Sequence, residues 1–248
     1  MNLYLDIGNT AVKYGLFAEG RLKRLGMSLN YDIPKIIRIC SCGGAHNYKN
    51  VIISSVVPEL TKKSVDLFRK SKSTSLWIVG VNIPLKIKHK YHNYNKLGKD
   101  RAVNIYGALK KYKLPLLVLD FGTALKADYI SKQGVFEGGL IIPGPEISFQ
   151  ALLSRAALLP KNMRLPEKSV SLLGKNTLDC MKAGILEGYG SMADGLIERF
   201  KRKFGSNLTV LATGGFSRHL KPYTRRLDIV DPWHSIKSLH LLFQEFSK

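Results

Sequence analysis

The 248-residue sequence has no hydrophobic run long enough to cross a lipid bilayer. A membrane-spanning helix needs about 20 consecutive apolar residues, whereas the best candidate, which begins at Leu114, stops at Asp120. The amino terminus also lacks the basic segment, apolar stretch and small-residue cleavage site of a secretory signal. We therefore expect a soluble, cytoplasmic protein with no membrane partner.

Cysteine is scarce, with only Cys40, Cys42 and Cys180 in the chain. An odd number of cysteines does not suggest a closed disulfide framework, and one Cys-x-Cys pair without a second pair does not match a structural zinc site. We expect free thiols in a reducing cytosol.

Acidic residues are also few, with 18 Asp and Glu against 39 Lys and Arg, which gives a formal net charge of +21. Several lysines between residues 86 and 99, interleaved with Tyr91 and Tyr94, are compatible with a groove that binds nucleic acid. No helix-turn-helix, zinc-finger or RNP-type pattern accompanies them, so we favour a solvated surface that steers anionic substrates. Hydrophobic residues make up 45% of the chain, which is typical of a folded globular protein.

The sequence contains an internal repeat. Residues 3–10 (LYLDIGNT) recur as residues 117–124 (LVLDFGTA). Each copy is an apolar segment that ends in Asp, an apolar residue and Gly, and a second strand-like segment follows at residues 12–17 and 125–130. Each unit is therefore predicted to be a strand, a tight turn and a second strand.

Two later segments fit the same duplication. Residues 50–55 and 208–213 are both apolar and both lead into loops of small residues. Helical segments lie between the predicted strands, which indicates an α/β fold. We predict two similar domains, residues 1–115 and residues 116–248.

The repeated turns have the chemistry of phosphate-binding loops. A glycine two residues after a strand-terminal Asp leaves backbone N–H groups accessible, and Asn9 and Thr10 add donors to the first turn. Asp6 and Asp120 would repel phosphate unless a cation lies between them and the nucleotide. A single Asp-x-Gly is often an ordinary β-turn, but its duplication favours two loops that clamp one polyphosphate.

A long helix is predicted to begin near Thr177, which is a good N-cap residue. Gly184 and Gly188 lie four residues apart on one side of it and would let another backbone approach closely. We expect this helix to serve as core or interface and to hold no cofactor. The apolar residues that recur every three to four positions along it are Met181, Ile185, Met192, Leu196 and Phe200.

Seven short motifs follow one another nearly from end to end of the chain. They are Asp6-Ile7-Gly8-Asn9-Thr10, Ser54-Ser55-Val56-Val57-Pro58, Tyr91-x-Asn93 ahead of Leu97-Gly98-Lys99-Asp100-Arg101, Asp120-Phe121-Gly122-Thr123-Ala124, Gly138-Gly139-Leu140-Ile141-Ile142-Pro143-Gly144, Gly174-Lys175-Asn176-Thr177 and Thr213-Gly214-Gly215. Any one of them is a weak signal. The ordered set resembles the type III pantothenate kinases, a family that also contains the Bvg accessory factors and belongs to the acetate and sugar kinase, Hsp70 and actin superfamily.

The resemblance implies an α/β fold of two duplicated ribonuclease-H-like domains with an interdomain cleft, assembled as a homodimer. It also implies transfer of the ATP γ-phosphoryl group to the primary hydroxyl of pantothenate, the first step of coenzyme A biosynthesis. ATP would be the phosphoryl donor, Mg²⁺ would accompany it, and K⁺ or NH₄⁺ would bind at Asp120. Phosphoryl transfer requires mainly positioning and charge neutralisation, which such a site would supply.

The resemblance assigns roles to residues by their position in these motifs. The ATP-binding residues would be Asp6, Ile7, Gly8, Asn9, Thr10, Ala11, Val12, Lys13 and Thr123. The pantothenate-binding residues would be Tyr91, Gly98, Lys99, Asp100, Arg101 and Thr177, with Asp100 as the catalytic proton acceptor. Without the resemblance, Asp100 and Arg101 could equally form a surface ion pair, Tyr91 a core aromatic contact and Thr177 a helix cap.

The chain departs from the family pattern in two places. Leu125 and Lys126 replace two threonines of the second phosphate loop, where Lys126 would offer a compensating positive charge, and Tyr94 replaces a common proline. Two alternatives therefore stay open. One is a catalytically weakened regulator of the accessory-factor kind that binds nucleic acid or a protein partner, and the other is a related kinase for another small hydroxylated substrate.

Overall fold

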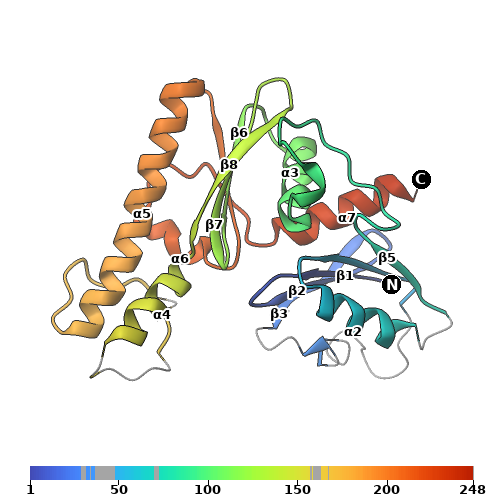
Figure 1. Ribbon diagram of the computed structural model, residues 1–248, viewed down its shortest axis with the longest axis horizontal. Helices are drawn as coiled ribbons and strands as arrows, with labels where there is room; N and C mark the ends of the chain where they lie inside the picture. The colour runs from blue at the N-terminus through green and yellow to red at the C-terminus, as the bar shows by residue number, and fades with distance from the viewer. Residues whose placement is uncertain are drawn as a thin grey trace. The chain divides into compact units, whose positions relative to one another are not determined.

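The computed structural model, drawn in Figure 1, divides into two compact units. The first comprises Met1–Lys110 and Trp233–Lys248, and the second comprises Lys111–Pro232. Within the described part of the chain, no helix combines the length and apolarity that crossing a bilayer requires. The described residues are 1–28, 32–33, 35–36, 48–69, 73–156, 158, 163–166 and 168–247.

The first unit is built on a five-stranded sheet in the order β3-β2-β1-β4-β5. β2 is antiparallel to β1 and β3, whereas β4 is parallel to β1 and β5. Its elements in chain order are β1 (Asn2–Ile7), β2 (Val12–Ala18), β3 (Arg21–Ser28), β4 (Asn50–Ser55), α2 (Pro58–Phe68), β5 (Ser75–Ile78), the 3-10 helix η1 (Tyr94–Lys96), α3 (Lys99–Lys111) and α7 (His234–Phe246).

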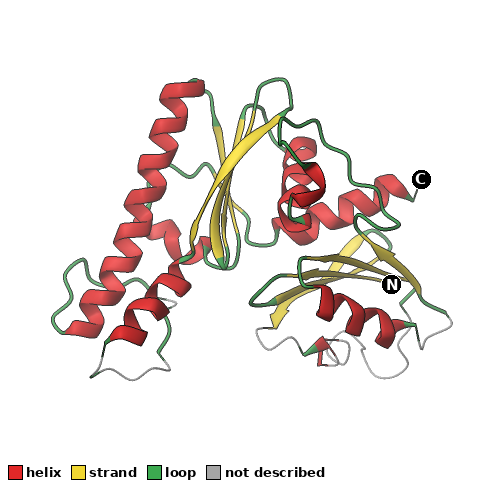
Figure 2. Ribbon diagram, viewed as in Figure 1, coloured by secondary structure: helices red, strands yellow, loops and turns green. Residues whose placement is uncertain are grey.

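Side chains of β1 point alternately to the two faces of the sheet in the first unit and pack against the helix on each face. Leu3, Leu5 and Ile7 belong to a buried cluster that includes Phe68 of α2. Tyr4 points to the other face, where its ring packs edge-on against Phe243 of α7. The period-two alternation of the strand therefore puts α2 and α7 on opposite faces of this sheet, as Figure 2 shows.

The carboxyl-terminal helix α7 belongs to the first unit, which differs from the predicted division at residues 115 and 116. The His240 ring stacks on Phe17, and its Nδ1 atom forms a hydrogen bond of 2.9 Å with the Tyr4 hydroxyl oxygen. At Gly107 of α3 an added Cβ would collide with Ser238 of α7, so the two helices touch. An amphipathic helix can dock on either sheet, and these contacts fix its place.

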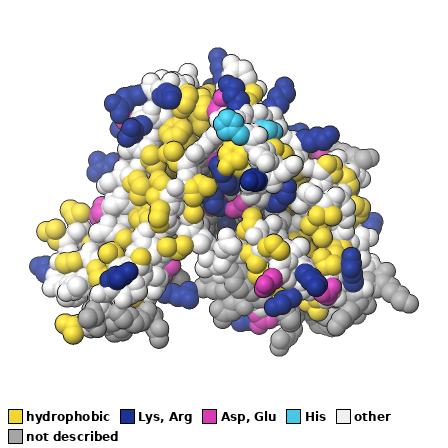
Figure 3. Space-filling model, viewed as in Figure 1, with side chains coloured by type: hydrophobic (Ala, Val, Ile, Leu, Met, Phe, Trp, Pro, Cys, Tyr) yellow, Lys and Arg dark blue, Asp and Glu magenta, His cyan; other side chains and the backbone are white. Residues whose placement is uncertain are grey.

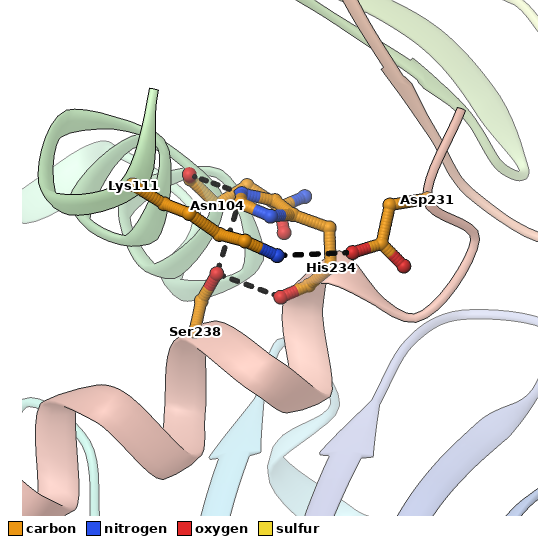
Figure 4. A network of polar contacts seen from close by, with 5 residues as sticks. All are labelled: Asn104, Lys111, Asp231, His234 and Ser238. Carbon is orange, nitrogen blue, oxygen red and sulfur yellow. Dashed lines mark hydrogen bonds and ion pairs between the residues drawn. The ribbon is translucent and has the colours of Figure 1, made fainter. Parts of the chain in front are cut away.

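The start of α7 is held to α3 by a buried histidine, shown in Figure 4. His234 Nε2 lies 2.9 Å from the Asn104 carbonyl oxygen, which can only accept, so the ring nitrogen donates. The Ser238 hydroxyl donates to the His234 carbonyl at 2.7 Å. The ion pair in the same figure joins Lys111 and Asp231 of the second unit at 3.8 Å.

The second unit repeats the sheet of the first, which confirms the predicted duplication and the α/β class. Its strand order is β10-β9-β6-β7-β8, with β7 antiparallel to β6 and β8 and with β9 parallel to β6 and β10. Its elements are β6 (Leu116–Phe121), β7 (Ala124–Ile130), β8 (Phe136–Pro143), α4 (Pro145–Arg155), α5 (Thr177–Phe204), β9 (Thr209–Thr213), α6 (Ser217–Leu220), the 3-10 helix η2 (Lys221–Tyr223) and β10 (Ile229–Val230).

Helix α5 packs on the second sheet through a stripe offset from the predicted one. The predicted apolar positions, such as Ile185 and Met192, are partly buried and pack against the core of the second unit. The buried positions are Ala183, Leu186, Tyr189, Gly190, Ala193 and Ile197. An added Cβ at Gly184 or Gly188 would meet no described atom within 4 Å, so this small-residue side of α5 faces away from its own unit.

Candidate active site

The first candidate phosphate loop joins β1 to β2. Its turn is closed by the Gly8 amide, which donates to the Ala11 carbonyl at 3.0 Å, while Asn9 and Thr10 are exposed. The strand register places Lys13 directly opposite Asp6. Because opposite residues of an antiparallel pair share a face, a carboxylate and an ammonium group lie on the same side of the sheet at this turn.

Not every predicted ATP residue of this loop can contribute a side chain. Ile7 and Val12 are fully buried in the core of the first unit. Only their backbone groups are therefore available to a ligand. The polar side chains at the turn belong to Asp6, Asn9, Thr10 and Lys13.

Val56 connects the first phosphate loop to the predicted pantothenate loop. Its amide donates to the Ile7 carbonyl at 3.1 Å. Its Cγ1 atom lies 3.8 Å from the position that a Cβ would take on Gly98. The turn that carries it is fixed by the Ser55 hydroxyl, which accepts a hydrogen bond from the Val57 amide at 3.1 Å. The first unit thus brings these two predicted loops together.

Asp100 lies beside this junction, in the first turn of α3. A Cβ on Gly98 would come within 2.5 Å of its Oδ1 atom, so glycine leaves room for the carboxylate. The Ala102 amide donates to the Gly98 carbonyl at 3.1 Å, which begins the helix. A negative charge in the first turn of a helix is favourable because the unpaired N–H groups there carry partial positive charge.

Arg101 and Tyr91, two more of the predicted pantothenate residues, lie close to each other. The Arg101 guanidinium carbon lies 5.5 Å from the centre of the Tyr91 ring, a cation–π distance. Arg101 is 6% exposed, so it is not the surface ion-pair residue that the sequence also allowed. Lys99 packs its side chain against Gly80, where an added Cβ would lie 2.6 Å from the lysine Cε.

The loop that leads into α3 is held rigid by local contacts. The Tyr94 hydroxyl donates to the Leu85 carbonyl at 2.7 Å, and its ring stacks on His89. The Asn93 side chain accepts from the Asn95 amide at 3.1 Å and caps η1. Tyr94, which stands where the family commonly has proline, therefore has an anchoring contact of its own.

The second candidate phosphate loop joins β6 to β7 in the second unit. Asp120 is 9% exposed and Thr123 is partly exposed. The Lys126 Nζ atom lies 3.0 Å from the Asp120 Oδ2 atom. The Gly144 amide donates to the Thr123 carbonyl at 3.0 Å, which fixes the tip of the turn.

The Thr213-Gly214-Gly215 motif packs directly on this loop. Gly214 has a φ of +92°, which side chains rarely adopt. An added Cβ there would collide with the Phe121 carbonyl oxygen and would lie 2.6 Å from the Asp120 Oδ1 atom. Glycine is required at this position by conformation and by space, and the motif braces the strand end that carries Asp120.

Thr177 is exposed at the first position of α5, but it is not the helix cap. The preceding Asn176 takes that role, because its side chain accepts from the Asp179 amide at 2.9 Å. Cys180 is a free, exposed thiol, as predicted. Cys40 and Cys42 lie outside the described residues.

Sequence reasoning missed two of these features. Val56 lies in the Ser54-Ser55-Val56-Val57-Pro58 motif, but nothing in its side chain indicates that it contacts two loops. The pairing of Lys126 with Asp120 needs the strand register, which places the two residues opposite each other. The two-residue turn between β6 and β7 was the available signal for that register.

Comparison with known proteins shows which family this chain resembles. The family model for type III pantothenate kinase matches residues 2–199. A type III pantothenate kinase of Syntrophus aciditrophicus is 34% identical over 100% of both chains, and one of Bacillus cytotoxicus is 35% identical over 98% of this chain and 96% of its own. A solved Baf family protein of Campylobacter jejuni shares the fold, with a TM-score of 0.60 and 19% identity over 99% of this chain and 98% of its own.

These matches run through both units and include every motif from the first phosphate loop to the start of α5. The chain therefore belongs to the type III pantothenate kinase family.

Proposed function

We propose that this protein transfers the γ-phosphoryl group of ATP to the primary hydroxyl of pantothenate, the first step of coenzyme A biosynthesis. Family membership supports the reaction. The observation that carries it in the structure is the junction at Val56, which sets the first phosphate loop beside Asp100. A phosphate-binding turn next to a carboxylate is what transfer to a hydroxyl requires, since one positions the donor and the other the acceptor.

In this proposal, the backbone and polar side chains of residues 6–13 bind the ATP phosphates in the first unit. Lys13 supplies positive charge at that turn, and Thr123 contacts ATP from the second unit. The transferred group carries charge spread over its oxygens, so fixed N–H groups and an ammonium group would stabilise it.

Asp100 is the proposed catalytic residue. An alcohol is a poor nucleophile, and a carboxylate within hydrogen-bond reach can orient it and accept its proton as the phosphoryl group moves. Arg101 is the proposed partner of the pantothenate carboxylate, because a guanidinium group binds a carboxylate through two parallel hydrogen bonds. Tyr91, Gly98 and Lys99 would complete the pantothenate site around them.

The two kinds of cation that the family resemblance implies fit this chain differently. Mg²⁺ would accompany ATP and neutralise its phosphates, with Asp6 at the first loop as the nearby carboxylate. A monovalent ion at Asp120 fits less well, because the Lys126 ammonium group already lies 3.0 Å from the Asp120 carboxylate.

We also propose that the protein is a homodimer formed through α5 and that Thr177 reaches the pantothenate site of the partner subunit. Gly184, Gly188 and Gly195 leave open space on one side of the helix. The surface over α5 carries many hydrophobic side chains (Figure 3). Both features favour a protein contact at α5. The cytoplasm, where ATP is available and thiols stay reduced, is the proposed location.

Steady-state assays with pantothenate and Mg-ATP test the function. We expect release of one ADP for each pantothenate that gains a phosphoryl group, measured by mass spectrometry of the product. A panel of other small alcohols should turn over far more slowly. ATP hydrolysis without phosphopantothenate, or equal rates on an unrelated alcohol, would refute the assignment.

A further inference from the structure

Asp120 and Lys126 form an ion pair within the second unit. The strand register sets Lys126 directly opposite Asp120 across the β6–β7 hairpin. Their charged atoms are 3.0 Å apart, and the side chains of Lys126 and Asp120 are only 15% and 13% exposed. The hairpin register thus places the ammonium group within ion-pair distance of the carboxylate, and both side chains are largely shielded from solvent.

A carboxylate at this position needs a cation. Asp120 is nearly buried, and an unpaired buried charge is strongly unfavourable. It also lies two residues before Gly122 in the loop proposed to bind phosphate, where two negative groups would repel each other. A mobile ion from solvent is one way to neutralise it, and a lysine ammonium group is the other.

The space around the Asp120 carboxylate is also restricted. A Cβ on Gly214 would lie 2.6 Å from Oδ1, and a Cβ on Gly122 would lie 3.5 Å from the same atom. Backbone therefore approaches Oδ1 closely from two sides, while Lys126 contacts Oδ2.

We propose that the Lys126 ammonium group is the permanent counter-ion of Asp120, so that this enzyme binds ATP and turns over without a monovalent cation from solution. This inference rests on the proposed kinase function. It replaces the expected K⁺ or NH₄⁺ at Asp120 with a group that the chain supplies itself. The first hairpin has the same strand register, with Lys13 opposite Asp6, so a lysine faces a strand-end carboxylate across the hairpin in both copies of the repeat.

The test compares the wild-type protein in KCl, NH₄Cl and choline chloride at equal ionic strength and constant Mg²⁺. Two quantities are measured in each salt, kcat/KM for ATP and the thermal midpoint of unfolding. We expect the wild-type values of kcat/KM to agree within about twofold, because the positive charge that neutralises Asp120 is already supplied by Lys126. The thermal midpoint should likewise not respond to K⁺ specifically.

Lys126→Thr restores the residue type common in the family and leaves Asp120 without its ammonium partner. We expect this variant to gain a K⁺ or NH₄⁺ dependence of about tenfold or more in kcat/KM and a K⁺-specific rise in the thermal midpoint, since an ion that binds only the folded state stabilises it. Lys126→Arg keeps the charge and should stay independent of K⁺. Lys132→Met, at an exposed lysine of the same unit, is the matched control for loss of one positive charge.

The outcomes separate the inference from the function. A wild-type enzyme that needs K⁺ for activity overturns the inference and leaves the kinase assignment intact. A Lys126→Thr variant that ignores K⁺ in both measurements also overturns it, and if that variant does not fold, the wild-type salt comparison decides alone. If no salt supports pantothenate phosphorylation, the function fails, and the thermal midpoints still show whether the wild-type protein binds K⁺.

Discussion

The Asp100→Asn substitution tests the proposed proton acceptor directly. Asparagine keeps the size of the side chain and a carbonyl oxygen for the substrate hydroxyl, but it does not accept the proton. Loss of a general base typically costs about 10² to 10⁴ in rate, which corresponds to about 2.7 to 5.4 kcal/mol of activation free energy. Asparagine has the same number of heavy atoms as aspartate, so the substitution adds no atom to the space that Gly98 leaves beside this side chain.

The effect on folding should be much smaller than the effect on rate. Asp100 lies in the first turn of α3, where a negative charge contributes about 0.3 to 1 kcal/mol through the helix dipole. Glu59→Gln is the matched control, since Glu59 lies exposed in the first turn of α2 in the same unit. It should lower stability by a similar amount and leave turnover unchanged.

Single-turnover phosphorylation, with pantothenate binding measured by calorimetry, separates the two effects. We expect Asp100→Asn to bind pantothenate nearly as the wild type does while the chemical step slows by about 10² or more. A rate within about threefold of wild type would place the proton acceptor elsewhere. A large loss of binding with little loss of rate would assign Asp100 to substrate binding alone.

Three further predictions follow from other contacts. Arg101→Ala should raise the KM for pantothenate much more than it lowers kcat, and Arg101→Lys should recover only part of the loss, because lysine lacks the paired donors. If both variants instead lowered kcat equally, a role of Arg101 in substrate binding would be contradicted. Burial lowers the pKa of His240, so the folded protein resists protonation of this residue, and the free energy of unfolding should fall as pH drops below about 6.5. Urea titrations of His240→Gln at several pH values should show a weaker dependence of the unfolding free energy on pH, and an unchanged dependence would refute this prediction. Light scattering of the wild-type protein should give a molecular mass of about twice 27.7 kDa, and Gly188→Trp should yield a folded monomer with a raised KM for pantothenate. A wild-type monomer with full activity would refute the shared site.

The sequence alone determined the features that depend on short-range patterns. The repeat around Asp6 and Asp120 predicted two hairpins, since alternating apolar residues followed by Asp-x-Gly favour a strand and a tight turn wherever they occur. The strands at residues 50–55 and 208–213 were also predicted, and each pairs in parallel with the first strand of its unit as β4 and β9. The family resemblance was likewise contained in ordered motifs.

Tertiary structure decided the features that depend on which surfaces meet. The apolar face of α7 could have docked on either of two similar sheets, and its contacts with Tyr4 and Phe17 put it on the first. Asn176 and Thr177 both have side chains able to cap a helix, and backbone geometry gave that role to Asn176. Lys126 carries the same charge in any fold, but only the register of β6 and β7 brings it to Asp120, because an ion pair depends on a distance that residue types alone do not specify.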